Sequence, residues 1–240
     1  MSRRTLVGSA LTLALLGCAR PGEREAEKAI LRLLPDYLGP AKRYTVKVKG
    51  KSLGAISRGH LREVRIVGYD VRLTDELTVR ELTLDADEVA VDLKSRTLQG
   101  VTQALFSARI DPAPLDAMAR KRCPKLLDLK LRLTGKWVEV TLRPEVFGYP
   151  TVPITVLGTL APRGGGRALD FEPDRGRLLG VVPIPEALLD FVAERLNPVV
   201  DLSALTVPIR VDRAEVSGGS LVLSGNIPPD RLARWSPRPR

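Results

Sequence analysis

The sequence feature that most constrains the fold is a strict alternation of apolar and polar residues. Between Leu127 and Leu133 every second residue is a leucine, and Asp, Lys and Arg occupy the positions between them. After Gly135 the alternation resumes over residues 138–142. Successive side chains of a β-strand point to opposite faces of its sheet, so this period of two predicts two half-buried strands joined as a hairpin. A chain built of such strands must cover an apolar sheet face.

The same period predicts strands along most of the remaining chain. The apolar positions are even-numbered up to Ala86 and odd-numbered from Val89, so we expect a bulge or a turn between these two residues. Three glycines over residues 164–166 predict a turn rather than a phosphate-binding loop, because a strand follows them instead of a helix. The other predicted strands cover residues 43–49, 64–66, 82–86, 89–93, 104–110, 152–156, 168–172, 207–216 and 221–223.

Three helices are predicted from apolar residues at helical spacing and from the residues that end each helix. The first covers residues 26–34, with Ile30, Leu33 and Leu34 on one side, and is followed by prolines and a glycine. The second covers residues 112–122 after an Asp111 N-cap, and the third covers residues 185–196. Residues 18–25 are predicted to be a lipidated cysteine and a polar linker, 26–227 the main domain, and 228–240 a basic, disordered tail.

The N-terminus has the order of an export signal. Arg3 and Arg4 precede an apolar run over residues 6–16, and Gly17 and Cys18 end it as a lipobox. As a helix the apolar run would reach only about 17 Å, short of the ~30 Å that a membrane-spanning helix must cross. We therefore predict a lipoprotein signal peptide over residues 1–17, cleavage before Cys18, and lipid on that cysteine.

Two alternatives for the N-terminus stay open. Leu16 is bulkier than the usual lipobox residue, so the segment also fits an ordinary cleavable signal with an incidental cysteine. The pair Arg3-Arg4 also resembles a twin-arginine export signal. In each reading the mature chain is exported, and with lipid on Cys18 it is held at a membrane that faces the periplasm or the cell exterior.

The charge of the chain favours a membrane surface over nucleic acid as its partner. The formal net charge is +10, and loss of Arg3 and Arg4 lowers it to +8. A basic protein held beside a bilayer is attracted to anionic headgroups. Nucleic acid is not expected as a partner, because export separates the protein from nucleic acid and because aromatic residues for base stacking make up only 4% of the chain.

The residues offer no catalytic signature, so no enzyme activity, cofactor or metal site is expected. There are two cysteines and one histidine, and Cys123 has no cysteine partner if Cys18 carries lipid. His60 lies in a separate segment from Cys123, and no nucleophile elbow or metalloprotease motif is present. The acidic cluster of Asp85, Asp87 and Glu88 is expected to be a solvated face of a strand.

From Gly158 to Gly225 the order of motifs resembles a known family. It resembles the LmeA-like phospholipid-binding family of bacterial envelope proteins, and the resemblance extends over roughly residues 26–227. Residues 59–64, Gly-His-Leu-Arg-Glu-Val, are similar to the start of the family's run of strands. The motifs in the C-terminal half are Gly-Thr-Leu at 158–160, Leu-Asp-Phe-Glu-Pro at 169–173, the helix from Ile184, Leu-Asn-Pro at 196–198, Asp-Leu-Ser at 201–203, Val-Pro-Ile-Arg at 207–210 and Leu-Val-Leu-Ser-Gly at 221–225.

The resemblance implies an α+β, tubular lipid-binding fold, similar to one half of the bactericidal permeability-increasing proteins. In that fold a long, strongly bent antiparallel sheet wraps around an amphipathic helix, with an acyl-chain cavity between them. It implies non-catalytic binding, and possible transport, of phospholipid or another acyl-chain lipid at the cell envelope. The lipobox and the high basic charge depart from the family pattern and leave the site of action open.

The residues themselves suggest where lipid would contact such a domain. Strictly alternating strands with few covering helices leave apolar surface that lipid tails can fill, at about 25 cal/mol per Å². The open alternatives are that the same side chains pack a closed core, or that the protein is a scaffolding lipoprotein that binds another envelope protein. The headgroup or membrane-surface candidates are Lys47, Lys49 and Lys51, and the cavity candidates are Val46, Val48, Leu127, Leu129, Leu131, Leu188, Phe191 and Val192.

Overall fold

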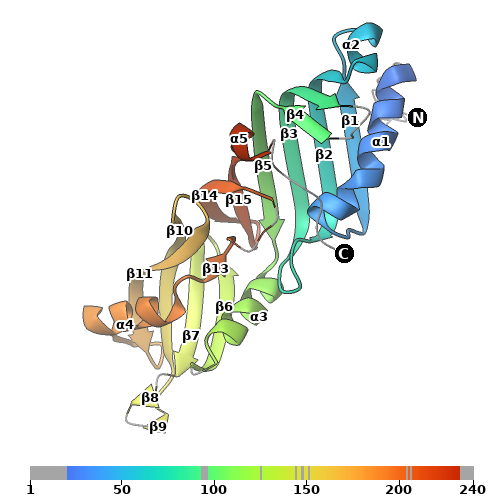
Figure 1. The fold of residues 1–240 in the computed structure, drawn as a ribbon. Helices are drawn as coiled ribbons and strands as arrows, with labels where there is room; N and C mark the ends of the chain where they lie inside the picture. Colours follow the sequence, from blue (N-terminus) through green and yellow to red (C-terminus); the bar gives the residue numbers. More distant parts are fainter. Residues whose placement is uncertain are drawn as a thin grey trace, which may run out of the picture.

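The computed structural model shows an elongated α+β protein in which most strands belong to two antiparallel sheets (Figure 1). It describes residues 21–92, 97–124, 126–143, 145–146, 149–150, 152–203, 205 and 207–232. The antiparallel α+β class expected from the sequence is therefore confirmed. The strands divide between two sheets, each covered in part by helices of its own, instead of forming one long sheet around a single helix.

Sheet A contains the N-terminal strands together with the last hairpin of the chain. Its order is β1-β2-β3-β5-β15-β14, and β4 pairs with β3 beyond this path. The hairpin returns from the C-terminal end and places β15 beside β5, with Leu223 opposite Ala108. The strands are β1 (Arg43–Lys49), β2 (His60–Arg72), β3 (Thr78–Asp92), β4 (Thr97–Gly100), β5 (Gln103–Ile110), β14 (Arg210–Ser217) and β15 (Ser220–Asn226).

Sheet B is formed by the central part of the chain, in the order β12-β11-β10-β7-β6, and β13 pairs with β11. The hairpin predicted from the leucine alternation is confirmed as β6 and β7. The strands are β6 (Leu127–Thr134), β7 (Trp137–Arg143), β10 (Ile154–Arg163), β11 (Ala168–Leu178), β12 (Val182–Pro183) and β13 (Val200–Asp201); β8 (Glu145–Val146) and β9 (Tyr149–Pro150) pair only with each other.

The two sheets meet through the predicted glycine turn. β10 packs against β14, and the Val211 N–H donates to the Gly166 carbonyl at 2.9 Å. A Cβ on Gly166 would lie 2.4 Å from the Val211 carbonyl oxygen, so only glycine permits this approach. The turn prediction is confirmed, and the turn also connects the sheets.

Helices cover the sheets only in part (Figure 1). α1 lies along β1, α3 lies along β6, and α4 lies on β11. The bounds are α1 (Pro21–Leu38), α2 (Leu53–Ser57), α3 (Pro112–Arg122), α4 (Glu186–Leu196) and α5 (Pro229–Leu232). In the described ranges, none of these helices is long and apolar enough to cross a bilayer.

α1 is longer at both ends than the sequence indicated. The predicted linker residues 21–25 belong to it, and it continues past Pro35 to Leu38. A proline costs one helix hydrogen bond, but burial of Leu34 and Leu38 against sheet A offsets that loss. The helix ends where Gly39 adopts a φ of 107°.

The remaining element predictions can be compared directly. α3 and α4 begin within one residue of expectation, with Asp111 and Pro185 at their N-cap positions. The Asp111 carboxylate makes no cap hydrogen bond and accepts instead from the Ser220 hydroxyl at 3.1 Å. β3 runs unbroken across the predicted phase slip, where Glu88 has a φ of 50°. In the predicted tail, residues 229–232 form α5, and residues 233–240 lie outside the described residues.

Candidate functional site

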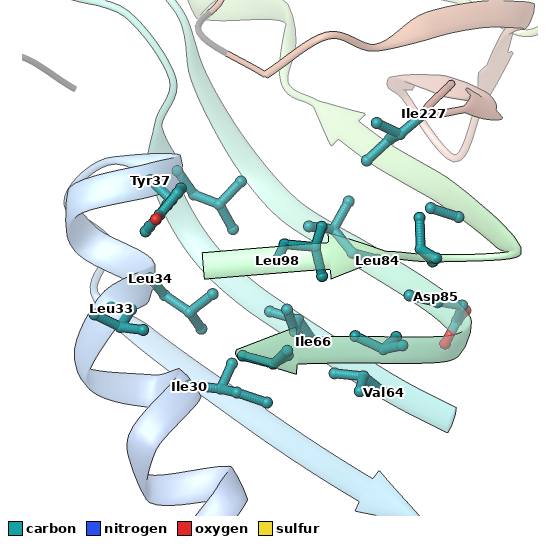
Figure 2. A pocket seen from close by; sticks show the side chains of 16 residues that line it. Ile30, Leu33, Leu34, Tyr37, Val64, Ile66, Leu84, Asp85, Leu98 and Ile227 are labelled. Carbon is teal, nitrogen blue, oxygen red and sulfur yellow. The ribbon is translucent and has the colours of Figure 1, made fainter. Parts of the chain in front are cut away.

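An apolar cavity of about 180 Å³ lies between α1 and sheet A (Figure 2). Ile30, Leu33, Leu34 and Tyr37 line it from α1 and share one face of the helix, since they are three and four residues apart. The other wall comes from β2 to β5 and from Ile227, after β15. Its residues are Val64, Ile66, Leu84, Asp85, Ala86, Val89, Val91, Leu98, Val101 and Ala104, and Leu38 closes one end.

The cavity exists because one helix covers a wide sheet from its edge. β1 is an edge strand, and the outward-facing amide of Val48 and the amide of Gly50, just after the strand, are bonded to α1 rather than to another strand. The Val48 N–H donates to Glu27 Oε1 at 3.1 Å, and the Gly50 N–H donates to Glu23 Oε1 at 3.0 Å. These bonds hold the helix beside β1, so the apolar side chains of β2, β3 and β4 are only partly covered.

The walls are almost wholly aliphatic. Of the described residues that line it, only Asp85 and Tyr37 have polar side-chain atoms. The Asp85 carboxylate forms an ion pair with Arg65, at 3.4 Å between Oδ1 and Nε. Such walls give dispersion contacts without directional groups, which suits a hydrocarbon chain better than a polar ligand.

The size of the cavity limits what it holds in this conformation. A 150 Å³ apolar cavity in another protein stays dry and admits benzene. By that measure a cavity of about 180 Å³ has room for a short length of hydrocarbon but not for a complete lipid tail.

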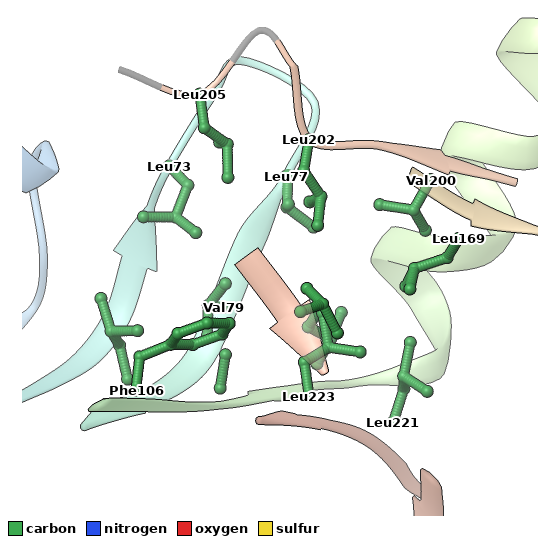
Figure 3. Close-up of a cluster of buried hydrophobic side chains, with 14 of the residues drawn as sticks. Leu73, Leu77, Val79, Phe106, Leu169, Val200, Leu202, Leu205, Leu221 and Leu223 are labelled. Atoms are coloured by element: carbon green, nitrogen blue, oxygen red, sulfur yellow. The ribbon is translucent and has the colours of Figure 1, made fainter. Parts of the chain in front are cut away.

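A second apolar cavity of about 20 Å³ lies further along the same side of sheet A. Leu38 and Leu84 line both cavities and therefore stand between them. The walls of the second cavity include Leu73 and Leu77 from the β2–β3 turn and Leu205 from the segment before β14 (Figure 3). The apolar interior is thus continuous from α1 toward the junction of the sheets, apart from these two leucine side chains.

The lysines proposed to meet headgroups lie away from this cavity. In β1 the side chains of Val46 and Val48 are buried, whereas the alternating Lys47 and Lys49 are exposed on the opposite face. Lys49 pairs with Glu63 at 2.6 Å, and Lys51 pairs with a carboxylate of β3 at 2.9 Å. The hydrogen bond from Lys49 holds the pKa of Glu63 below its ordinary value. Contact of these lysines with a membrane stays a prediction.

The cavity candidates chosen from the sequence do not line the cavity between α1 and sheet A. Val46 and Val48 lie in sheet A beside it and are buried in the core. The other six belong to β6 and α4 in or on sheet B: Leu129, Leu131 and Val192 are buried, Leu188 and Phe191 are half-buried, and Leu127 is exposed. The sequence did place Ile30, Leu33 and Leu34 on one helix face, and that was the available signal for the α1 wall.

The structure gives Cys123 a local partner. Its Sγ lies 3.2 Å from the Arg195 carbonyl oxygen, to which the thiol donates, and burial raises the pKa of the thiol. A thiol that stays protonated is a poor nucleophile. Across the described ranges, no group of three or more His, Cys, Asp or Glu residues is arranged to hold a metal ion. Cys18, the predicted lipid anchor, lies outside the described residues.

Together the fold and the cavity define a class: a two-sheet α+β protein whose interior can accept an apolar ligand. The family model described as LmeA-like phospholipid-binding matches residues 18–226. The chain therefore belongs to this family, as its motifs indicated. No curated protein and no solved structure matches the chain.

Proposed function

We propose that this protein binds phospholipid by enclosing part of an acyl chain in the cavity between α1 and sheet A. The observation that carries the proposal is the almost purely aliphatic cavity in a chain of the LmeA-like phospholipid-binding family. Each methylene moved from water into such a space gains about 0.8 kcal/mol. The headgroup stays outside, because the walls offer it no polar partner deep in the protein.

A complete tail needs more room than the present cavity, and the continuity of the interior suggests where it extends. Rotation of Leu38 and Leu84 would join the two apolar cavities along sheet A. In the lipid-loaded protein, we propose, the helices and the two bent sheets enclose one tubular space. This is the arrangement found in tubular lipid-binding folds.

The cell envelope, as the place where the protein acts, is part of the same proposal. The lipobox supports export and attachment through lipid on Cys18, so the domain would work at the cell envelope and bind or carry lipid without catalysis. Replacement of Cys18 by Ala should abolish incorporation of labelled fatty acid and release the protein from the membrane fraction. Undiminished labelling of that variant would contradict the anchor.

The cavity is tested by filling it. Ala104 is a buried lining residue on β5, and Ala104→Leu adds three carbons to the cavity. Native mass spectrometry and lipid extraction of the chain from residue 21 onward should find phospholipid in the parent protein and much less in this variant. Ala193→Leu, at a half-buried position of α4 away from the cavity, should leave lipid content unchanged.

The opposite result would point to a structural void. If the parent protein contains no lipid and Ala104→Leu simply raises its stability, the cavity is a packing defect, and the scaffolding role becomes the better reading. Small-to-large changes in a tightly packed core cost about 1–3 kcal/mol, so a gain in stability would be informative.

A further inference from the structure

Exposed apolar side chains gather at one end of sheet B. In the part of the chain that the structure describes, eight large apolar residues are exposed, and five of them lie at this end: Leu127, Val152, Leu179, Val181 and Val182. The strand registers bring them together. Leu127 is opposite Arg143, Ile154 is opposite both Leu142 and Leu178, and the Leu179 N–H donates to the Pro153 carbonyl. We call these five residues the apolar tip.

The apolar tip lies at the far end of the molecule from α1 and α2, near β8 and β9 (Figure 1). From Leu127 on β6 to Leu179 at the end of β11 there are three strand spacings. Neighbouring strands are about 4.8 Å apart, so the tip is on the order of 14 Å wide. Val181 and Leu179 expose 73% and 60% of their surface. The tip is a protruding edge made largely of turns rather than a groove.

The turn that carries Leu179 is unusual for its sequence. The Val181 N–H donates to the Leu178 carbonyl at 3.1 Å, and the two central residues, Leu179 and Gly180, have φ angles of 49° and 78°. Leu178 pairs with Val182, so the turn is part of a three-residue loop. Turns with a positive φ at both central residues strongly favour Asn or Asp before the glycine. A leucine is strained there and, being exposed, gains little packing in return. The folded domain alone does not account for this leucine.

Positive charge accompanies the tip. Arg177 Nη1 donates to the Gly180 carbonyl at 3.5 Å, which holds its guanidinium beside the turn. Arg143 lies in the same row as Leu127 and pairs with Asp128 at 3.0 Å. Asp128 offsets the charge of Arg143, so Arg177 is the cation beside the turn on which the match depends. Aliphatic side chains next to a guanidinium group suit the interface of an anionic bilayer, where apolar groups meet hydrocarbon and guanidinium groups meet phosphate.

We propose that the apolar tip docks on anionic membrane by shallow insertion of Leu179, Val181 and Val182 between lipid headgroups. A fluid lipid surface fits a protruding turn of aliphatic side chains better than a shaped protein groove would. The inference goes beyond the lipid-binding cavity, because docking and cavity occupancy use opposite ends of the molecule. Each can therefore hold or fail independently of the other.

The test uses the chain from residue 19 onward, which carries neither the apolar signal segment nor an acyl anchor. In this background, Leu179→Asn with Val181→Ser should reduce co-sedimentation with vesicles of phosphatidylglycerol and phosphatidylcholine by roughly tenfold. Asn is favoured in this turn, so the thermal unfolding temperature should not fall, which separates binding from folding. The matched control is Leu53→Asn, at an exposed leucine of α2, and it should bind vesicles like the parent.

A second measurement locates the insertion. With the native Trp137 and Trp235 replaced by Phe, fluorescence of Val181→Trp should shift to shorter wavelength with vesicles and be quenched by brominated acyl chains. Fluorescence of Leu53→Trp in the same background should neither shift nor be quenched. Ala104→Leu, which blocks the cavity, should still bind vesicles. Parent-like binding of the Leu179→Asn, Val181→Ser variant, or equal quenching at positions 53 and 181, would overturn the proposal.

Discussion

At the scale of single residues, Leu38 stands between the two apolar cavities along sheet A. Its side chain is 1% exposed, and it is one of the two leucines shared by the cavity under α1 and the smaller cavity beyond it. It is also the last residue of α1, next to Gly39, so the end of the helix sets its position. Leu38 and Leu84 together therefore separate the cavity under α1 from the smaller cavity beyond it.

Replacing Leu38 by Ala should join the two cavities. We expect a loss of about 2–5 kcal/mol in the free energy of unfolding of the lipid-free protein, because a buried leucine leaves a void. The bound lipids should shift toward longer acyl chains, which mass spectrometry of extracted lipid would measure.

Leu115→Ala provides the matched control for that experiment. Leu115 is fully buried on α3 and lines neither cavity, so its loss should cost comparable stability and leave the chain-length distribution unchanged. An equal shift in chain length for both variants would show that Leu38 does not act as a barrier.

At the scale of elements, two helices protect the edges of the sheets in the same way, through a carboxylate that accepts a hydrogen bond from an edge-strand amide. Glu27 of α1 accepts a hydrogen bond from the Val48 amide of β1. In the same way, Asp116 Oδ1 of α3 accepts a hydrogen bond from the Leu131 amide of β6 at 2.8 Å. Both strands lie at sheet edges, where unpaired amides invite pairing with another chain. Each carboxylate therefore holds its helix beside the strand and also occupies an amide of the sheet edge.

Glu27→Ala should loosen α1 from β1. The Val48 amide is part-buried and loses its acceptor, so we expect a loss of about 1–2 kcal/mol and faster hydrogen exchange at that amide. Glu25→Ala, at an exposed position of the same helix, should change neither quantity. Unchanged exchange at Val48 in the Glu27 variant would mean that packing alone holds α1.

At the scale of the whole molecule, the arrangement of the two sheets depends on a close contact of two backbones. Gly166 on the β10–β11 turn lies against Val211 of β14, with a φ of 80°. Neighbouring Gly164 has a similar φ of 58°, but no atom lies within 4 Å of where its Cβ would be. The two glycines therefore differ in crowding but little in backbone strain.

This difference predicts the outcome of two alanine substitutions. Gly164→Ala should cost about 1–2 kcal/mol, from the left-handed conformation alone. Gly166→Ala should lower the free energy of unfolding by about 1–3 kcal/mol more than Gly164→Ala does, because its Cβ forces the two backbones apart. Chemical denaturation of the two variants measures the difference, and equal losses would show that the sheet junction does not need this contact.

The sequence by itself determined most of the long strands, three of the five described helices, and which side of each is apolar. The short elements α2, α5, β4, β12 and β13 were not predicted. The alternation over residues 127–142 predicted the β6–β7 hairpin, and the spacing over residues 185–196 predicted α4 almost to its ends. These features are local: a side chain two or four residues along the chain shares a face whatever the rest of the protein does.

Only the tertiary structure decided which apolar faces remain partly uncovered. The pairing of β15 with β5, the hold of Glu23 and Glu27 on β1, and the contact of Gly166 with Val211 join residues far apart in sequence. They place the cavity under α1, whereas leucines of β6 with an equally clear pattern are packed in sheet B. Periodicity reports the direction of a side chain, and the space in front of it depends on how distant segments pack.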